Sequence, residues 1–174
     1  MVLDVRLKKL AKGLSSRAAA DAYALSQAAP GSLRGEQLAQ AAEFEATIEA
    51  MFLMAAVDGD ITDAELGQLA ASCQAMIDVS GARPVEVGKL LTTLNKRLAA
   101  EGWKARLDAV AARLKGEEAR SFAFRLAAGV AFVDDHVAHA EAAAIDALAA
   151  ALALTPEESQ ELLSDVQETL FGLH

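Results

Sequence analysis

The sequence predicts an all-α protein with a single compact helical domain of about eight helices. Apolar residues recur at helical spacing along almost the whole chain. Alanine is frequent in these periodic stretches and aromatic residues make up only 5% of the chain, so residues that favour strands are scarce. A chain of 174 residues with 53% hydrophobic content can bury one sizeable core. We therefore expect one domain without a sheet.

Clusters of Gly, Pro and Ser divide the periodic pattern into helices. Two of the helix starts carry capping-box sequences, with Thr62 followed by Glu65 and Thr155 followed by Pro156 and Glu158. A basic amphipathic segment at 2–14 comes first. The predicted helices then lie at 16–29, 36–57, 63–79, 84–100, 103–115, 117–133, 139–152 and from 155 onward.

One sequence motif occurs twice in the chain. Residues 55–65 read AAVDGDITDAE and residues 131–141 read AFVDDHVAHAE, and the two align without a gap at an offset of 76 positions. Each copy is an apolar helix end, a short acidic loop and an amphipathic helix with Glu in its first turn. The pattern predicts an internal repeat of two helix–loop–helix units, at about 40–79 and 117–154.

Charge is distributed unevenly between two predicted parts, an N-terminal basic amphipathic helical segment at 1–35 and a helical domain at 36–174. Residues 1–30 carry five basic and two acidic side chains, although the whole chain has a net charge of −9. The acidic remainder argues against nucleic-acid binding. The segment 2–14 either packs on its own domain or makes peripheral contact with an anionic membrane or a partner.

Nothing in the sequence suggests a membrane span or a secretory signal. The apolar windows are too short or too interrupted for a span, which needs about 20 apolar residues. Arg6, Lys8, Lys9 and Lys12 interrupt any apolar core near the N-terminus. The one Cys permits no intrachain disulfide. We therefore expect a soluble cytoplasmic protein.

The two acidic loops are the candidate metal sites. Residues 58–66 look like the second half of a calcium-binding EF-hand, but loop positions 1 and 3 would then fall on Met54 and Ala56, which have no oxygen ligand. A functional EF-hand is therefore rejected. A simpler cation site remains possible, and its candidate ligands are Asp58, Asp60, Glu65, Asp134, Asp135, His136, His139 and Glu141, with Asp63 as an accessory.

The ions expected at the two loops differ. The first loop offers only oxygen ligands and so favours calcium or magnesium. The second adds His136 and His139, which favour zinc or nickel. The alternative explanation for the repeated motif is structural, because Thr62 and Glu65 form a helix cap and Ile61 and Val137 fill the core between helices.

The same residues carry a family resemblance. The pattern Ala-x-x-Asp-Gly-x-hydrophobic-x-x-x-Glu fits fully at 55–65, and it fits at 131–141 apart from Asp135 in place of Gly. The chain resembles the TerB-like family, named for tellurite-resistance protein B, over roughly 38–171. The resemblance implies a compact helical fold, acidic clusters suspected of binding metal ions, and a role in stress or metal-ion resistance. It implies no catalytic reaction.

Catalytic machinery is not evident in the chain, so we expect no enzymatic activity. The sequence has no nucleophile elbow and no phosphate-binding loop. Cys73 lies on an apolar helix stripe and is expected to be buried, as are the Phe and Met groups at 51–54 and 122–132. The predicted function is a cation-binding, stress-response scaffold, and the alternative is a metal-free module whose acidic face binds an unidentified protein partner. The oligomeric state is left open.

Overall fold

The computed structural model describes residues 16–29, 31, 33–57, 61–80, 86–132 and 139–172. Within these ranges the chain forms eight α-helices and no strand, so the predicted all-α fold class is confirmed. The helices are α2 (Ser16–Ala28), α3 (Glu36–Ala55), α4 (Asp63–Ser80), α5 (Val87–Glu101), α6 (Trp103–Arg113), α7 (Glu117–Ala131), α8 (His139–Ala151) and α9 (Pro156–Phe171).

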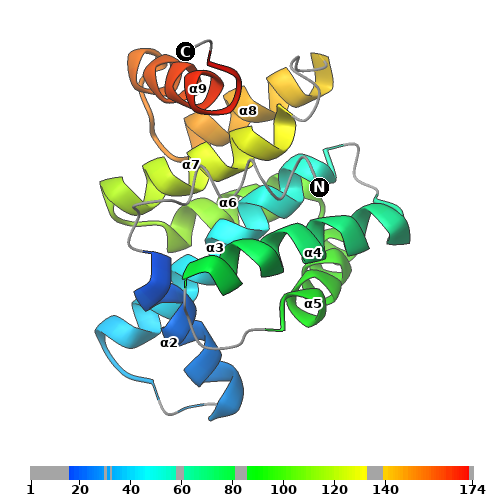
Figure 1. Cartoon of the computed structure of the whole chain (residues 1–174), viewed down its shortest axis with the longest axis vertical. Helices are drawn as coiled ribbons and strands as arrows, with labels where there is room; N and C mark the ends of the chain where they lie inside the picture. The colour runs from blue at the N-terminus through cyan, green and yellow to red at the C-terminus, as the bar shows by residue number, and fades with distance from the viewer. Residues whose placement is uncertain are drawn as a thin grey trace.

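Helix α3 is the central element of the domain (Figure 1). Its most extensive contacts are with α2 and α7, followed by α6. Residues 46–54 of α3 are all buried, because neighbouring helices cover this part of the helix on every side. A helix buried all round is expected to be apolar all round, and this stretch is, apart from Thr47 and Glu49.

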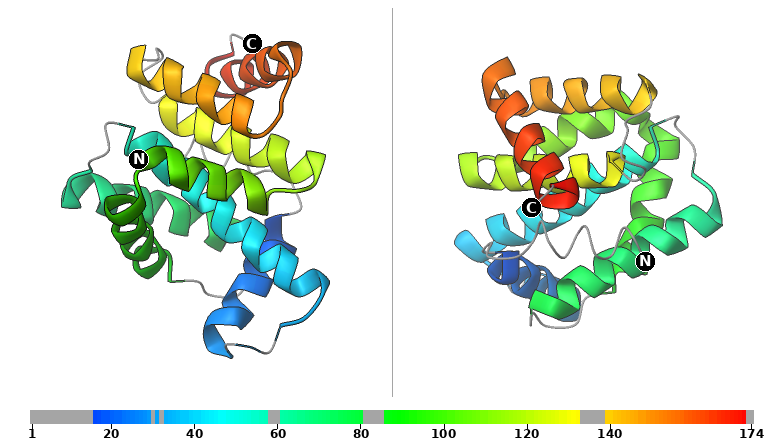
Figure 2. Two further views of the ribbon diagram at one scale, coloured as in Figure 1. Left: turned by 180° about the vertical axis from the view of Figure 1, so that it is seen from behind. Right: turned by 45° about the horizontal axis from the view of Figure 1, so that its top comes forward.

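The other helices form two groups beside α3 (Figures 1 and 2). Helices α4 and α5 pack against each other on one side. Helix α7 lies against α3 on the other side, and α8 and α9 both pack on α7. Helix α2 packs on α3 and also contacts α4. The result is a single compact domain.

Most helix boundaries lie within two residues of the prediction. The largest difference is at α5, which begins at Val87 instead of residue 84. The segment 2–14 and residues 81–85 lie outside the described residues. The helix start at Thr155 is confirmed in detail. Its hydroxyl accepts a hydrogen bond from the Glu158 N–H, and the Glu158 carboxylate accepts one from the Thr155 N–H.

The core contains the residues that the sequence predicted. Phe44, Ile48, Met51 and Phe124 are buried, and so is Cys73. Ile61, expected to fill the core between helices, is also buried. Phe122 is an exception because its side chain is only half-buried at the core margin.

Candidate functional site

Among the predicted metal ligands, the structure describes the side chains of Glu65 and of the accessory Asp63, and both are exposed. His139 and Glu141 belong to α8, but their side chains lie outside the described part of the structure. The remaining predicted ligands, Asp58, Asp60, Asp134, Asp135 and His136, lie outside the described residues, as does Val137. Among the described residues there is no group of three or more His, Cys, Asp or Glu side chains arranged to hold a metal ion.

Glu65 forms the predicted capping box with Thr62. The Thr62 N–H donates to Glu65 Oε1 at 3.2 Å, the Thr62 hydroxyl donates to the same oxygen at 2.8 Å, and the Glu65 N–H donates to the Thr62 hydroxyl at 3.1 Å. The hydroxyl and N–H of Thr62 lower the pKa of the Glu65 carboxyl. The Glu65 side chain is exposed, and its Oε2 atom takes no part in the capping box.

The helices that flank the two acidic loops end and begin at matching positions. Helix α3 ends at Ala55 and α7 at Ala131, which are 76 positions apart. Helix α4 begins at Asp63 and α8 at His139, which are also 76 positions apart. The ends of α3 and α7 and the starts of α4 and α8 lie on the same side of the domain (Figures 1 and 2).

A small cavity lies between the flanks of the two loops. It has a volume of about 320 Å³ and is lined by Val57, Trp103, Ala143 and Ala144. Val57 directly precedes the first loop, and the two alanines lie in the first half of α8, after the second loop. The cavity therefore lies between the residue that follows the end of α3 and the first half of α8.

Trp103 fixes the end of α3 beside this cavity. Its indole Nε1 donates a 2.9 Å hydrogen bond to the carbonyl oxygen of Leu53. Leu53 lies in the last turn of α3, where carbonyl groups lack the usual partner within the helix. The bond satisfies such a group and joins the start of α6 to the helix end that leads into the first loop.

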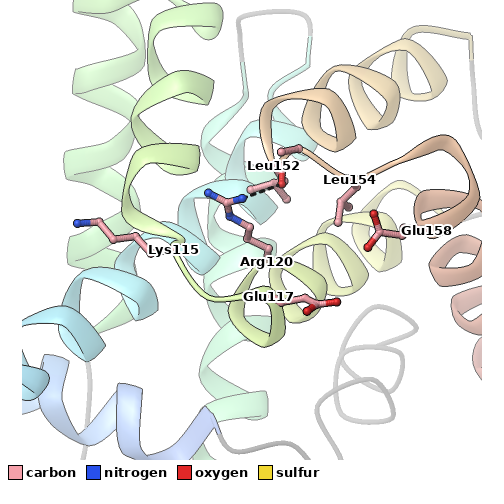
Figure 3. A pocket seen from close by; sticks show the side chains of 7 residues that line it. Lys115, Glu117, Arg120, Leu152, Leu154 and Glu158 are labelled. Carbon is pink, nitrogen blue, oxygen red and sulfur yellow. Dashed lines mark hydrogen bonds between the residues drawn. The ribbon is translucent and has the colours of Figure 1, made fainter.

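A second cavity, of about 330 Å³, lies where the α6–α7 and α8–α9 connections meet (Figure 3). Its central cation is Arg120, whose guanidinium donates to the carbonyl oxygens of Leu114 and Leu152, the latter at 3.2 Å. These carbonyls lie at the C-terminal ends of α6 and α8, where a cation is favourable. The cavity is lined by Lys115, Glu117, Arg120, Leu152, Ala153, Leu154 and Glu158.

An ionic cluster around the buried Glu49 and Arg106 joins α3, α5 and α6, and the sequence did not predict it. Its members are Glu45 and Glu49 of α3, Arg97 and Glu101 of α5, and Arg106 and Arg113 of α6. Arg97 lies 2.7 Å from Glu45, and Arg113 contacts both glutamates. The signal in the sequence was a pair of glutamates, Glu45 and Glu49, in a largely apolar helix, where a spacing of four places both on one face.

Comparison with known proteins found no matching family model, no matching curated protein and no matching solved structure. None of the described helices combines the length and the apolar character that crossing a membrane requires.

Proposed function

We propose that this chain is a TerB-like, non-enzymatic protein of the stress-response or tellurite-resistance type, which binds divalent cations at its two acidic helix–loop–helix sites. The proposal starts from the repeated motif at 55–65 and 131–141. The observation that carries it furthest is the arrangement of the flanking helices. Their ends match at an offset of 76 positions, and one cavity is lined by Val57, which follows α3, and by Ala143 and Ala144 of α8.

Glu65 fits the role of a ligand to a hard cation. Its carboxylate is exposed, and the hydrogen bonds from Thr62 lower its pKa further below neutral. The capping box uses Oε1, so Oε2 can coordinate a cation while the cap stays intact. Asp58 and Asp60 would complete the oxygen ligands of a calcium or magnesium site. Asp134, Asp135 and Glu141 would act with His136 and His139 at a zinc or nickel site.

A metal-free interaction module is the second candidate. The observation that favours it is the same capping box, because Thr62 and the start of α4 account for Glu65 without any ion. In that case the acidic loops would form a recognition surface for a basic protein partner. The two functions differ in whether the isolated chain binds a divalent ion.

A calorimetric titration of the full chain with calcium, magnesium and zinc separates the two functions. If the loops bind cations, Asp58→Ala and Asp134→Ala each weaken binding while helicity measured by circular dichroism stays unchanged. Asp146→Ala, which removes an exposed carboxylate from α8, is the matched control and leaves the affinity as in the parent. Unchanged affinity in the Asp58→Ala/Asp134→Ala double variant contradicts the cation proposal and favours the interaction module.

The pH dependence distinguishes the two loops. Imidazole must be neutral to bind a metal, so zinc binding at the second loop weakens as the pH falls from about 7.5 to about 5.5. Calcium binding at the first loop changes little over that range because carboxylates titrate near pH 4. The His136→Ala/His139→Ala variant is the control for the zinc arm. If it binds zinc as tightly as the parent, the histidines are not ligands.

A further inference from the structure

The cavity between the α6–α7 and α8–α9 connections is bordered by four helix termini (Figure 3). Helices α6 and α8 end beside it, at Arg113 and Ala151, and helices α7 and α9 begin beside it, at Glu117 and Pro156. A helix end carries a partial negative charge and a helix start a partial positive one. The volume of about 330 Å³ is at the lower end of the range of roughly 300–1,000 Å³ for ligand pockets. The cavity therefore has room for a small ligand and surroundings of both signs.

Two cationic and two anionic side chains line this cavity without pairing with each other. The cations are Lys115 and Arg120, and the anions are Glu117 and Glu158. In Figure 3 the two cationic groups lie to one side and the two carboxylates to the other. Among these four described side chains, no carboxylate oxygen comes within the 4.0 Å of a cationic nitrogen that defines an ion pair. The lining is therefore neutral in sum but has its charges separated.

Arg120 keeps a donor group for a ligand although it already joins two helix ends. Its Nε donates to the carbonyl oxygen of Leu114, and its Nη1 donates to that of Leu152. The Nη2 group donates to no residue in the described part of the chain, and it is not one of the buried atoms that lack a partner. The two carbonyl contacts hold the guanidinium in place, which lowers the cost of ordering it around a ligand. A carboxylate is a preferred partner of such a group.

The two carboxylates keep acceptor atoms in the same way. Glu117 is exposed and makes no hydrogen bond or ion pair with any residue that the structure describes. Glu158 uses Oε1 to accept from the Thr155 N–H, and its Oε2 takes no part in that capping box. Both carboxylates can therefore accept hydrogen bonds from an ammonium group without giving up a contact within the protein.

We propose that this cavity binds a short zwitterion of dipeptide size, with its carboxylate at Arg120 Nη2 and its ammonium group at Glu117 and Glu158. A simple anion would meet two carboxylates in a chain of net charge −9, and a simple cation would meet the guanidinium. Two residues span at most about 7 Å, so the charged ends of a dipeptide can reach protein groups that are too far apart to pair directly. The site does not depend on cation binding at the acidic loops.

A nuclear magnetic resonance titration of the full chain with diglycine tests the site, read from the Arg120 Nε–H signal and the amides of residues 152–158. Two blocked probes are the matched ligand controls. Acetyl-diglycine lacks the ammonium group, and diglycinamide lacks the carboxylate. Each loses one charge-assisted contact, so each binds about tenfold more weakly than diglycine. The proposal is overturned if either blocked probe binds as tightly as diglycine, or if diglycine shifts none of these signals.

Glu117→Gln tests the protein side of the ammonium contact. This exposed contact is screened by water, so the affinity for diglycine falls by about two- to fivefold, whereas the affinity for acetyl-diglycine does not fall. The matched control is Glu157→Gln, which removes an exposed carboxylate beside Glu158 that does not line the cavity. An equal loss in the two variants overturns the proposal. Arg120 stays unchanged in this experiment because it also holds two helix ends, and diglycinamide tests its contact instead.

Discussion

The guanidinium of Arg106 donates two hydrogen bonds to the carboxylate of Glu49, from Nε at 2.7 Å and from Nη2 at 2.8 Å. Glu49 is fully buried, with 0% of its side chain exposed. Arg113 contacts the same carboxylate, and Arg106 also reaches Glu101. A buried charge is stable only when paired and hydrogen-bonded in this way, so the cluster fixes how α6 sits on α3.

Replacing Glu49 tests the importance of this pair. Glu49→Ala leaves Arg106 buried without its main partner, and we expect the free energy of unfolding to fall by about 3–5 kcal/mol. Chemical denaturation followed by the fluorescence of Trp103, the only tryptophan, measures the change. Lys104→Ala is the control, because it removes an exposed ion pair with Asp108 and should cost less than about 1 kcal/mol. Equal losses in the two variants would show that the buried pair has no special role.

The single tyrosine provides a direct test of the core beneath α2. Burial, and to a smaller extent the nearby Glu45 carboxylate, raise the pKa of Tyr23 from 10.0 to about 12. The ring packs on Phe44, with the two ring centroids 5.0 Å apart. Because the chain contains only one Tyr, the absorbance of its phenolate follows this group alone. We expect the absorbance to rise near pH 12, and a midpoint near pH 10 in the folded chain would contradict this environment.

The raised pKa of Tyr23 also predicts how stability changes with pH. The folded state favours the protonated phenol, so its contribution is fully present below pH 10.0 and is lost as the pH rises toward about 12. Denaturation midpoints measured across this range should therefore fall. Tyr23→Phe cannot ionise and serves as the control, with a smaller fall over the same range.

The Thr62–Glu65 cap should stabilise α4. Thr62→Ala removes the hydroxyl that accepts from the Glu65 N–H, and we expect a loss of about 0.5–2 kcal/mol. Thr92→Ala is a suitable comparison because its exposed hydroxyl only donates to the Gly88 carbonyl within α5. That change should be close to neutral or slightly stabilising, since Ala is the better helix former. An unchanged denaturation midpoint in Thr62→Ala would mean that the cap contributes nothing.

Ala153 occupies a backbone conformation that suits glycine. Its φ is 58°, and it follows α8 in a Schellman turn, with its own N–H donating to Ala150 and the Leu154 N–H donating to Ala149. The left-handed conformation costs a residue with a Cβ atom about 1–2 kcal/mol. Ala153→Gly should therefore raise the thermal midpoint, whereas Ala150→Gly, inside α8, should lower it by weakening the helix. A lower midpoint in Ala153→Gly would contradict this explanation.

The sequence by itself determined the helices, because their signals are local. Apolar spacing defined α3 and α7, and the Thr155-Pro156 pair located the start of α9 within one residue. The Thr62–Glu65 capping box was predicted for the same reason, since its partners lie three positions apart. The repeated motif likewise located the candidate loops, although most of their predicted ligands lie outside the described residues.

Only the tertiary structure decided which distant residues meet. Glu49 and Arg106 are separated by 57 positions, and Trp103 and Leu53 by 50, so no local pattern connects them. The helix packing that brings them together depends on the shape and burial of many side chains at once. The cavity shared by Val57 and Ala143 has the same origin, because α3 and α8 approach each other only when both are packed in the domain.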